Sequence, residues 1–123
     1  MHGYAIDAHK LSLHPKRVAS WLEGENIYPI YMEISPSGAC NHRCVFCSMD
    51  FMGYRSKFID TAMMQQRLGE CGKLGIKAVM FAGEGEPLLH PDIAILAHAA
   101  KAAGIDVSFT TNGVLLDEEC ARH

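Results

Sequence analysis

Residues 76–82 read IKAVMFA, and this run decides the fold class of the chain. Apolar side chains fill it almost without interruption, which is typical of a short strand buried on both faces of a parallel sheet. The glycine-rich segment GEGEP follows at residues 83–87 and predicts a turn where the strand ends. Because parallel strands are joined by crossover segments that are usually helical, we expect helices before and after residues 76–82.

Two further runs have the composition of strands. Residues 30–35 (IYMEIS) and residues 105–111 (IDVSFTT) are rich in β-branched and aromatic side chains. Residues 115–123 (LLDEECARH) have the composition of the start of a helix. With a helix between each pair of strands, the predicted order is β-α-β-α-β-α, which is the pattern of an α/β fold with a parallel sheet.

Start and stop signals place the two connecting helices. Asp60 or Thr61 can cap a helix that runs to about residue 74, where nearby glycines end it. Pro91 suits the first turn of a second helix because its ring fixes φ near the helical value, and Gly104 ends that helix.

A short preface, residues 1–29, precedes the βα repeat, which we assign to residues 30–123. No low-complexity tract or flexible linker separates the two segments, so we expect one domain. Pro15 can start a short helix in the preface. One side of that helix carries Val18, Trp21 and Leu22. We expect this apolar side to cover the bottom or the flank of the sheet.

The composition is that of an ordinary globular domain of 123 residues, with 49% hydrophobic and 20% charged residues. A formal net charge of −3 does not indicate nucleic-acid binding or attraction to an anionic membrane. The sequence has no apolar run long enough to span a bilayer, and its start lacks the apolar region of a secretory signal. We therefore expect a cytoplasmic protein. In a reducing cytosol, clustered cysteines favour metal ligands or catalytic groups over disulfides.

Three unusual segments each lie at the end of a predicted strand. They are GACNHRCVFCS at residues 38–48, GEGEP at 83–87 and TTNG at 110–113. In parallel α/β folds, whether the sheet is open or closed into a barrel, functional groups gather at the carboxyl ends of the strands. The sequence therefore predicts that all three segments lie on one rim of the sheet.

The first segment contains three cysteines, Cys40, Cys44 and Cys47, in the spacing C-x3-C-x2-C. Thiolates are soft ligands that select zinc, copper(I) or iron-sulfur clusters. A structural zinc site uses four protein ligands, so three thiolates leave one coordination position open for another ligand. A zinc site completed by a histidine is the main alternative, although His42 lies too close in sequence to Cys40 and Cys44 to complete it easily.

These residues carry a resemblance to a known family. CNHRCVFC resembles the C-x3-C-x-aromatic-C loop of the radical S-adenosylmethionine (radical SAM) superfamily, with Phe46 in the aromatic position. The segment GEGEP at residues 83–87 is similar to the family's GGEP segment in its GxGEP form. TTNG resembles the corresponding segment of the branches for molybdenum-cofactor biosynthesis and peptide modification. The resemblance covers about residues 30–117.

The resemblance implies a set of site residues. The three cysteines would ligate three irons of a 4Fe-4S cluster, and the fourth iron would bind the amino and carboxylate groups of S-adenosylmethionine. Phe46 would lie against the adenine. The methionine amino group would be received by Gly83, Glu84, Gly85 and Glu86. Thr110, Thr111 and Asn112 have hydroxyl and amide groups suited to the ribose or the substrate.

The resemblance also implies a reaction. An electron from a donor such as flavodoxin or ferredoxin enters the cluster, and reductive cleavage of S-adenosylmethionine gives a 5'-deoxyadenosyl radical. The radical abstracts hydrogen from a substrate, a small molecule or a peptide, whose identity the sequence leaves open. Glu33 would contact this substrate if its side chain points inward. The alternative function is a non-catalytic metal-binding or electron-transfer module that uses the three-cysteine loop.

The length limits what this chain can do alone. A radical SAM core is usually a partial TIM barrel of six βα units, which at roughly thirty residues each needs on the order of two hundred residues. This chain contains about three such units. We therefore expect residues 30–123 to be the amino-terminal half of a truncated core that binds a cluster but does not turn over by itself.

Overall fold

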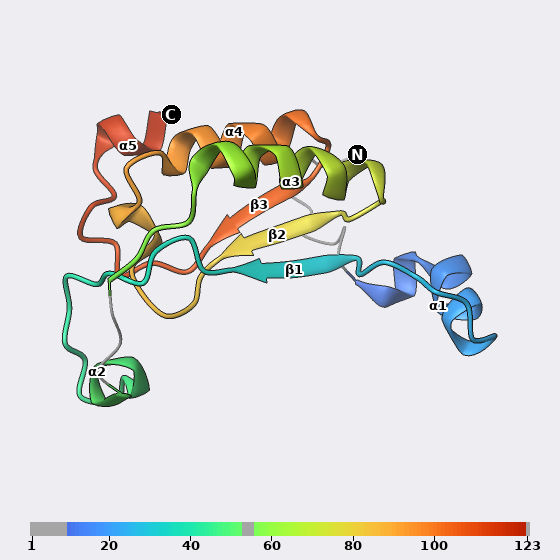
Figure 1. Ribbon diagram of the computed structural model, residues 1–123, viewed down its shortest axis with the longest axis horizontal. Helices are drawn as coiled ribbons and strands as arrows, with labels where there is room; N and C mark the ends of the chain where they lie inside the picture. The colour runs from blue at the N-terminus through green and yellow to red at the C-terminus, as the bar shows by residue number, and fades with distance from the viewer. Residues whose placement is uncertain (1–9, 53–55, 123) are drawn as a thin grey trace.

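The computed structural model describes residues 10–52 and 56–122. In this part of the chain, three parallel strands form one sheet in the order β1-β2-β3, and helices alternate with them (Figure 1). The elements are η1 (Leu11–Leu13), α1 (Pro15–Leu22), β1 (Tyr31–Ile34), α2 (Ser48–Met52), α3 (Thr61–Lys73), β2 (Ala78–Phe81), η2 (Pro87–Leu89), α4 (Ile93–Ala102), β3 (Asp106–Phe109) and α5 (Glu118–Arg122). The predicted α/β fold with a parallel sheet is confirmed.

Helices α3 and α4 cover one face of the sheet (Figure 1). The core lies between them and alternate residues of the strands, and its largest fully buried side chains include Phe81, Leu68, Leu96 and Ile105. Burying a side chain of this size contributes about 1.5–3 kcal/mol relative to leaving it in water. This layer of apolar contacts therefore holds the strands in register and fixes where their carboxyl ends lie.

The opposite face of the sheet has no covering helix among the described elements (Figure 1). Strand β2 pairs with both neighbours, and Val79 and Phe81 are fully buried, but Met80 on the other face is half-buried. The sequence predicted burial on both faces of this strand, and that prediction is wrong for Met80. The apolar pattern is that of a central strand, yet the described residues supply a covering layer on one face only.

The predicted connecting helices are confirmed with one shift in position. Asp60 caps α3, because its Oδ1 accepts a 2.7 Å hydrogen bond from the backbone N–H of Met63. Helix α4 begins at Ile93, two residues after Pro91, where we expected it to start. The later start is explained by His90. Its Nδ1 accepts a 3.1 Å hydrogen bond from the backbone N–H of Asp92, and this bond holds residues 91–92 in a turn before the helix.

The helix of the preface does not cover the sheet, so that prediction is wrong. Helix α1 lies beyond the amino end of β1 (Figure 1), and the side chain of Trp21 is 61% exposed. Arg17 donates hydrogen bonds to the carbonyl oxygens of Tyr28 at 3.0 Å and Pro29 at 3.3 Å. These bonds attach α1 to the segment that leads into β1.

Among the described residues, every helix is too short or too polar to cross a lipid bilayer.

Candidate functional site

The loops after β1, β2 and β3 meet at the carboxyl ends of the strands, as predicted (Figure 1). The β2 loop contacts the loop with the cysteines, because the backbone N–H of Glu86 donates a 2.8 Å hydrogen bond to the carbonyl oxygen of Ala39. A Cβ atom on Gly85 would lie 2.3 Å from the carbonyl oxygens of Ser37 and Ala39. Glycine is therefore required at position 85, because any side chain would push the two loops apart.

Gly83 and Ser35 make a second contact between the same two loops. Gly83 has a φ of 104°, and a Cβ atom there would lie 2.5 Å from the Cβ of Ser35. The Ser35 hydroxyl accepts a 3.2 Å hydrogen bond from the backbone N–H of Glu84. The side chain of Glu84 is exposed to solvent. These contacts fix the backbone of the glycine-rich loop and leave the Glu84 carboxylate free of this role.

Glu86 is the buried centre of the rim, with only 2% of its surface exposed. Its carboxylate accepts hydrogen bonds from the backbone N–H of Leu88 at 3.0 Å, the hydroxyl of Thr111 at 2.6 Å and the backbone N–H of Asn112 at 2.8 Å. A carboxylate has about four acceptor positions, so three donors from the chain leave roughly one position for another donor. Glu86 thus joins the loop after β2 to the loop after β3.

Asn112 connects the third loop to the loop with the cysteines. Its side-chain Nδ2 donates a 2.8 Å hydrogen bond to Oδ1 of Asn41, the residue after Cys40. Its Oδ1 accepts a 3.1 Å bond from the backbone N–H of Val114. The structure therefore brings the predicted residues Glu86, Thr111 and Asn112 together, and it adds Asn41, which sequence reasoning missed. A contact across 71 residues leaves no local signal in the sequence.

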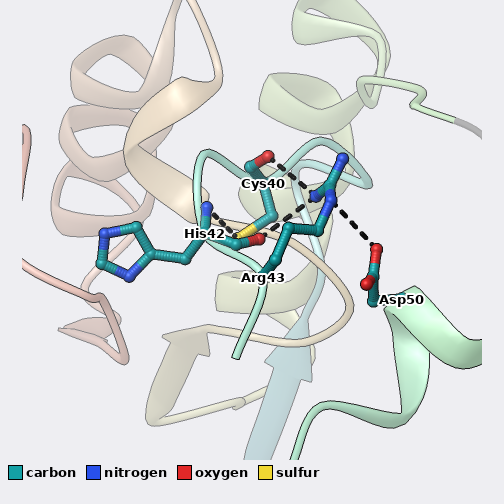
Figure 2. A network of polar contacts seen from close by, with 4 residues as sticks. All are labelled: Cys40, His42, Arg43 and Asp50. Carbon is teal, nitrogen blue, oxygen red and sulfur yellow. Dashed lines mark hydrogen bonds and ion pairs between the residues drawn. The ribbon is translucent and has the colours of Figure 1, made fainter. Parts of the chain in front are cut away.

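The cysteine loop is tied down at its start and near its end. The backbone N–H of His42 donates to Sγ of Cys40 at 3.4 Å, and the backbone N–H of Cys47 donates to the carbonyl oxygen of Cys44 at 2.9 Å. Arg43 fastens the middle of the loop to α2, which sequence reasoning missed (Figure 2). Its Nε lies 3.0 Å from Oδ1 of Asp50, and its guanidinium also donates to the carbonyl oxygen of His42 at 3.1 Å.

The three predicted ligands suit an iron-sulfur cluster by their chemistry. Cys40, Cys44 and Cys47 are free thiols, half-buried in one short loop, and soft thiolate donors are the ligands of such clusters. The imidazole ring of His42 points away from the sulfur of Cys40 (Figure 2), which does not favour the alternative of a zinc site. In the part of the chain that the structure describes, three metal-binding side chains do not converge on one point. The ligand assignment therefore stays a prediction.

Phe46 is 89% exposed, and its neighbour Val45 is also fully in solvent. Two residues of α2, Phe51 and Met52, are exposed as well. The loop and α2 therefore present apolar side chains to solvent beside the cysteines, and the role of Phe46 beside an adenine stays a prediction.

Two other polar groups, His90 and Cys71, have structural roles. His90 is buried, and because its Nδ1 accepts from Asp92, its Nε2 carries the proton and donates a 2.9 Å hydrogen bond to the carbonyl oxygen of Ile59. Cys71 lies on α3 with its Sγ 4.0 Å from Sδ of Met32. Burial raises the pKa of the Cys71 thiol, and the negative charge of Glu70 adds to this rise. Neither side chain belongs to the rim.

Comparisons with known proteins identify sequence relatives of this chain. The model of the Radical SAM superfamily matches residues 34–123. The GTP 3',8-cyclase of Chlorobaculum tepidum is 40% identical over 91 residues, which covers 72% of this chain and 27% of the cyclase. The GTP 3',8-cyclase of Clostridium acetobutylicum is 35% identical over 92 residues, which covers 72% of this chain and 29% of that cyclase. The chain thus spans less than a third of the length of these relatives.

Two solved structures have a similar fold. Streptococcus suis SuiB, in a crystal structure bound to S-adenosylmethionine, has a TM-score of 0.66 and 26% sequence identity. The match covers 91% of this chain and 26% of SuiB. SuiB bound to its precursor peptide SuiA has a TM-score of 0.67 at 24% identity, which shows the likeness of the fold. The two GTP 3',8-cyclases are enzymes by name, which supports the expectation of an enzyme. From the match over residues 34–123 and the three motif loops on one rim, the chain belongs to the radical SAM superfamily.

Proposed function

We propose that this chain is the part of a radical SAM enzyme that holds a 4Fe-4S cluster and S-adenosylmethionine. The observation that carries the proposal is the joining of the three motif loops through Glu86 and Asn112 beside the cysteines. When bound, the cluster supplies the electron for reductive cleavage of S-adenosylmethionine to methionine and a 5'-deoxyadenosyl radical, which abstracts hydrogen from substrate. The protein supplies binding, orientation and protection for this cofactor chemistry.

Different residues of the rim would bind different parts of the cluster and of S-adenosylmethionine. Cys40, Cys44 and Cys47 would hold three irons, which leaves one iron for the amino and carboxylate groups of S-adenosylmethionine. The backbone of the glycine-rich loop and the remaining acceptor position of Glu86 would receive the methionine ammonium. Phe46, an exposed ring in the loop with the cysteines, would cover the adenine. Thr111 and Asn112 already bond within the chain, so in this proposal they shape the wall of the site.

The same geometry supports the domain assignment. We propose that residues 30–123 form the amino-terminal part of a partial TIM barrel, with residues 1–29 as a preface outside it. The uncovered face of the sheet would then line the barrel interior, where a carbon radical is shielded from water. The enzyme would work in the cytoplasm with flavodoxin or ferredoxin as the electron donor, on a substrate that is a small molecule or a peptide.

Iron incorporation tests the ligand assignment. The chain is reconstituted anaerobically with iron and sulfide, and iron, sulfide and zinc are measured in the purified protein. We expect about four irons per chain, as a 4Fe-4S cluster requires. Cys44→Ala should lose the cluster, whereas Cys71→Ala, a matched change of a half-buried cysteine on α3, should keep it. Loss of iron from Cys71→Ala, or zinc in place of iron in the unaltered chain, would contradict the proposal.

A further inference from the structure

One row of side chains crosses the uncovered face of the sheet just before the rim. Glu33, Met80 and Ser108 occupy one register position on β1, β2 and β3. The adjacent residue Ile34 belongs to the buried core, and Met32 packs against it. Because side chains alternate along a strand, Glu33 lies on the opposite face, away from α3 and α4.

This row is continuous with the loops of the candidate site. The hydroxyl of Thr110 donates a 3.3 Å hydrogen bond to Sδ of Met80, which connects the middle of the row to the loop after β3. Ser35 follows Glu33 by two residues and bonds the backbone N–H of Glu84 in the loop after β2. A molecule in contact with the rim from this side of the sheet would therefore also meet the row.

The charge of this face is negative. The strands contribute to it Tyr31, Glu33, Ala78, Met80, Asp106 and Ser108, none of which is basic. Asp106 is paired with Nζ of Lys101 at 2.9 Å, so much of its charge is compensated. The Glu33 carboxylate is exposed and accepts a 3.1 Å hydrogen bond from the Tyr31 hydroxyl, which leaves it further acceptor positions. Glu33 thus carries the uncompensated charge on the described part of this face.

We infer that Glu33 is a specificity-determining residue that binds an ammonium or another cationic nitrogen donor of the substrate. This inference rests on the proposed function, because it takes the row to line the substrate side of the radical site. A carboxylate attracts a cationic donor and repels a polyphosphate at the same position. The chain should therefore take an amine-bearing substrate, for example one with a lysine side chain, and should disfavour a nucleoside triphosphate, the kind of compound in the name of the related cyclases.

Binding of two probes tests this inference. The chain is reconstituted with its cluster and S-adenosylmethionine, and equilibrium dialysis measures the retention of Nα-acetyl-lysine amide and of GTP. We expect the unaltered chain to retain the lysine probe more tightly than GTP. Glu33→Gln should weaken binding of the lysine probe about tenfold, because it removes the charge from a charge-assisted hydrogen bond. Glu70→Gln is the control, since it removes a carboxylate from α3 on the other side of the sheet.

The outcomes separate this inference from the proposed function. Equal retention of the lysine probe by the unaltered chain and Glu33→Gln would overturn it, as would tighter binding of GTP or no binding of the lysine probe. The same samples are examined by electron paramagnetic resonance with and without S-adenosylmethionine. If the cluster signal changes on addition of S-adenosylmethionine but the unaltered chain and Glu33→Gln retain the lysine probe equally, the inference about Glu33 is wrong and the proposed function stands. If the signal of the unaltered chain does not respond, the proposed function fails.

Discussion

The hydroxyl of Thr111 donates a 2.6 Å hydrogen bond to Oε1 of Glu86, and this bond joins the ends of β3 and β2 inside the rim. The other carboxylate oxygen accepts from the backbone N–H of Asn112. Two of the three family motifs are thus held together by one buried side chain. The position of the third, with the cysteines, depends on the close approach of Gly85 and on the bond between Asn112 and Asn41.

Removing the Glu86 carboxylate should destabilise the fold. In Glu86→Ala the backbone N–H groups of Leu88 and Asn112 lose their acceptor, and an unsatisfied buried donor costs about 1–3 kcal/mol. We expect the free energy of unfolding to fall by about 2–4 kcal/mol. Urea denaturation followed by circular dichroism measures it. Glu84→Ala, which removes an exposed carboxylate from the same loop, is the control and should change it by less than about 0.5 kcal/mol. Equal midpoints for the two variants would contradict this role of Glu86.

A methyl group at position 85 should separate the first two loops. The Cβ of Gly85→Ala would lie 2.3 Å from two backbone carbonyl oxygens, which cannot give way as a flexible side chain can. We expect a loss of about 1–3 kcal/mol in unfolding free energy and reduced iron incorporation. Gly69→Ala is the matched control, because its Cβ meets nothing within 4 Å and a helical glycine is worse than alanine by about 1 kcal/mol. The control should be at least as stable as the unaltered chain.

The bond between Asn112 and Asn41 should restrain the loop after β3. Asn41→Ala removes the acceptor of this 2.8 Å bond and leaves Glu86 untouched. A hydrogen bond of this kind contributes about 0.5–1.5 kcal/mol, so amide exchange in residues 111–113 should become roughly two- to tenfold faster. Hydrogen exchange with mass spectrometry measures the rates. Asn26→Ala, in the segment before β1, should leave them unchanged, and a similar result for Asn41→Ala would show that the bond does not restrain the loop.

Much of the fold was predictable because its signals are local. The apolar run that contains β2, the cap Asp60 and the end signal Gly104 are each read within a few residues, and all three are confirmed. The placement of α1 was not predictable. An apolar side predicts that a helix packs against another surface, but it does not indicate which surface that is. Arg17 attaches the helix to the segment before β1 through bonds to carbonyl oxygens eleven and twelve residues away, and such distant partners leave no local signal.

The candidate site was predictable in its parts and less so in its connections. The carboxyl-end rule placed the three motif loops on one rim, since it depends on topology alone. The sequence does not indicate that the Glu86 carboxylate accepts hydrogen bonds from Thr111 and Asn112. Nor does it indicate that the side-chain amide of Asn112 donates a hydrogen bond to Asn41. Such hydrogen bonds depend on the exact path of the backbone in three dimensions, which cannot be read from the composition of a sequence or the spacing of its motifs.

The thiol of Cys71 should react slowly with alkylating reagents. Burial raises its pKa and the Glu70 carboxylate adds to this, while Arg67 opposes the shift. Because only the thiolate is nucleophilic, alkylation by iodoacetamide at pH 8 should be slower in the folded chain than in urea. Mass spectrometry of the Cys71 peptide measures both rates. The raised pKa also means that this group stabilises the fold fully below the pKa of the unfolded thiol and that the contribution is lost as pH rises through the folded value. Equal alkylation rates in the two states would contradict the shift.

The most direct test of the central claim is electron paramagnetic resonance of the reduced, reconstituted chain with and without S-adenosylmethionine. Three cysteine ligands leave one iron of the cluster free, and binding of the amino and carboxylate groups there must change the electronic environment of the cluster. We predict a shift of the cluster signal on addition of S-adenosylmethionine. Adenosine, which lacks the amino and carboxylate groups, should cause no shift. A cluster signal that is the same with and without S-adenosylmethionine would contradict the account.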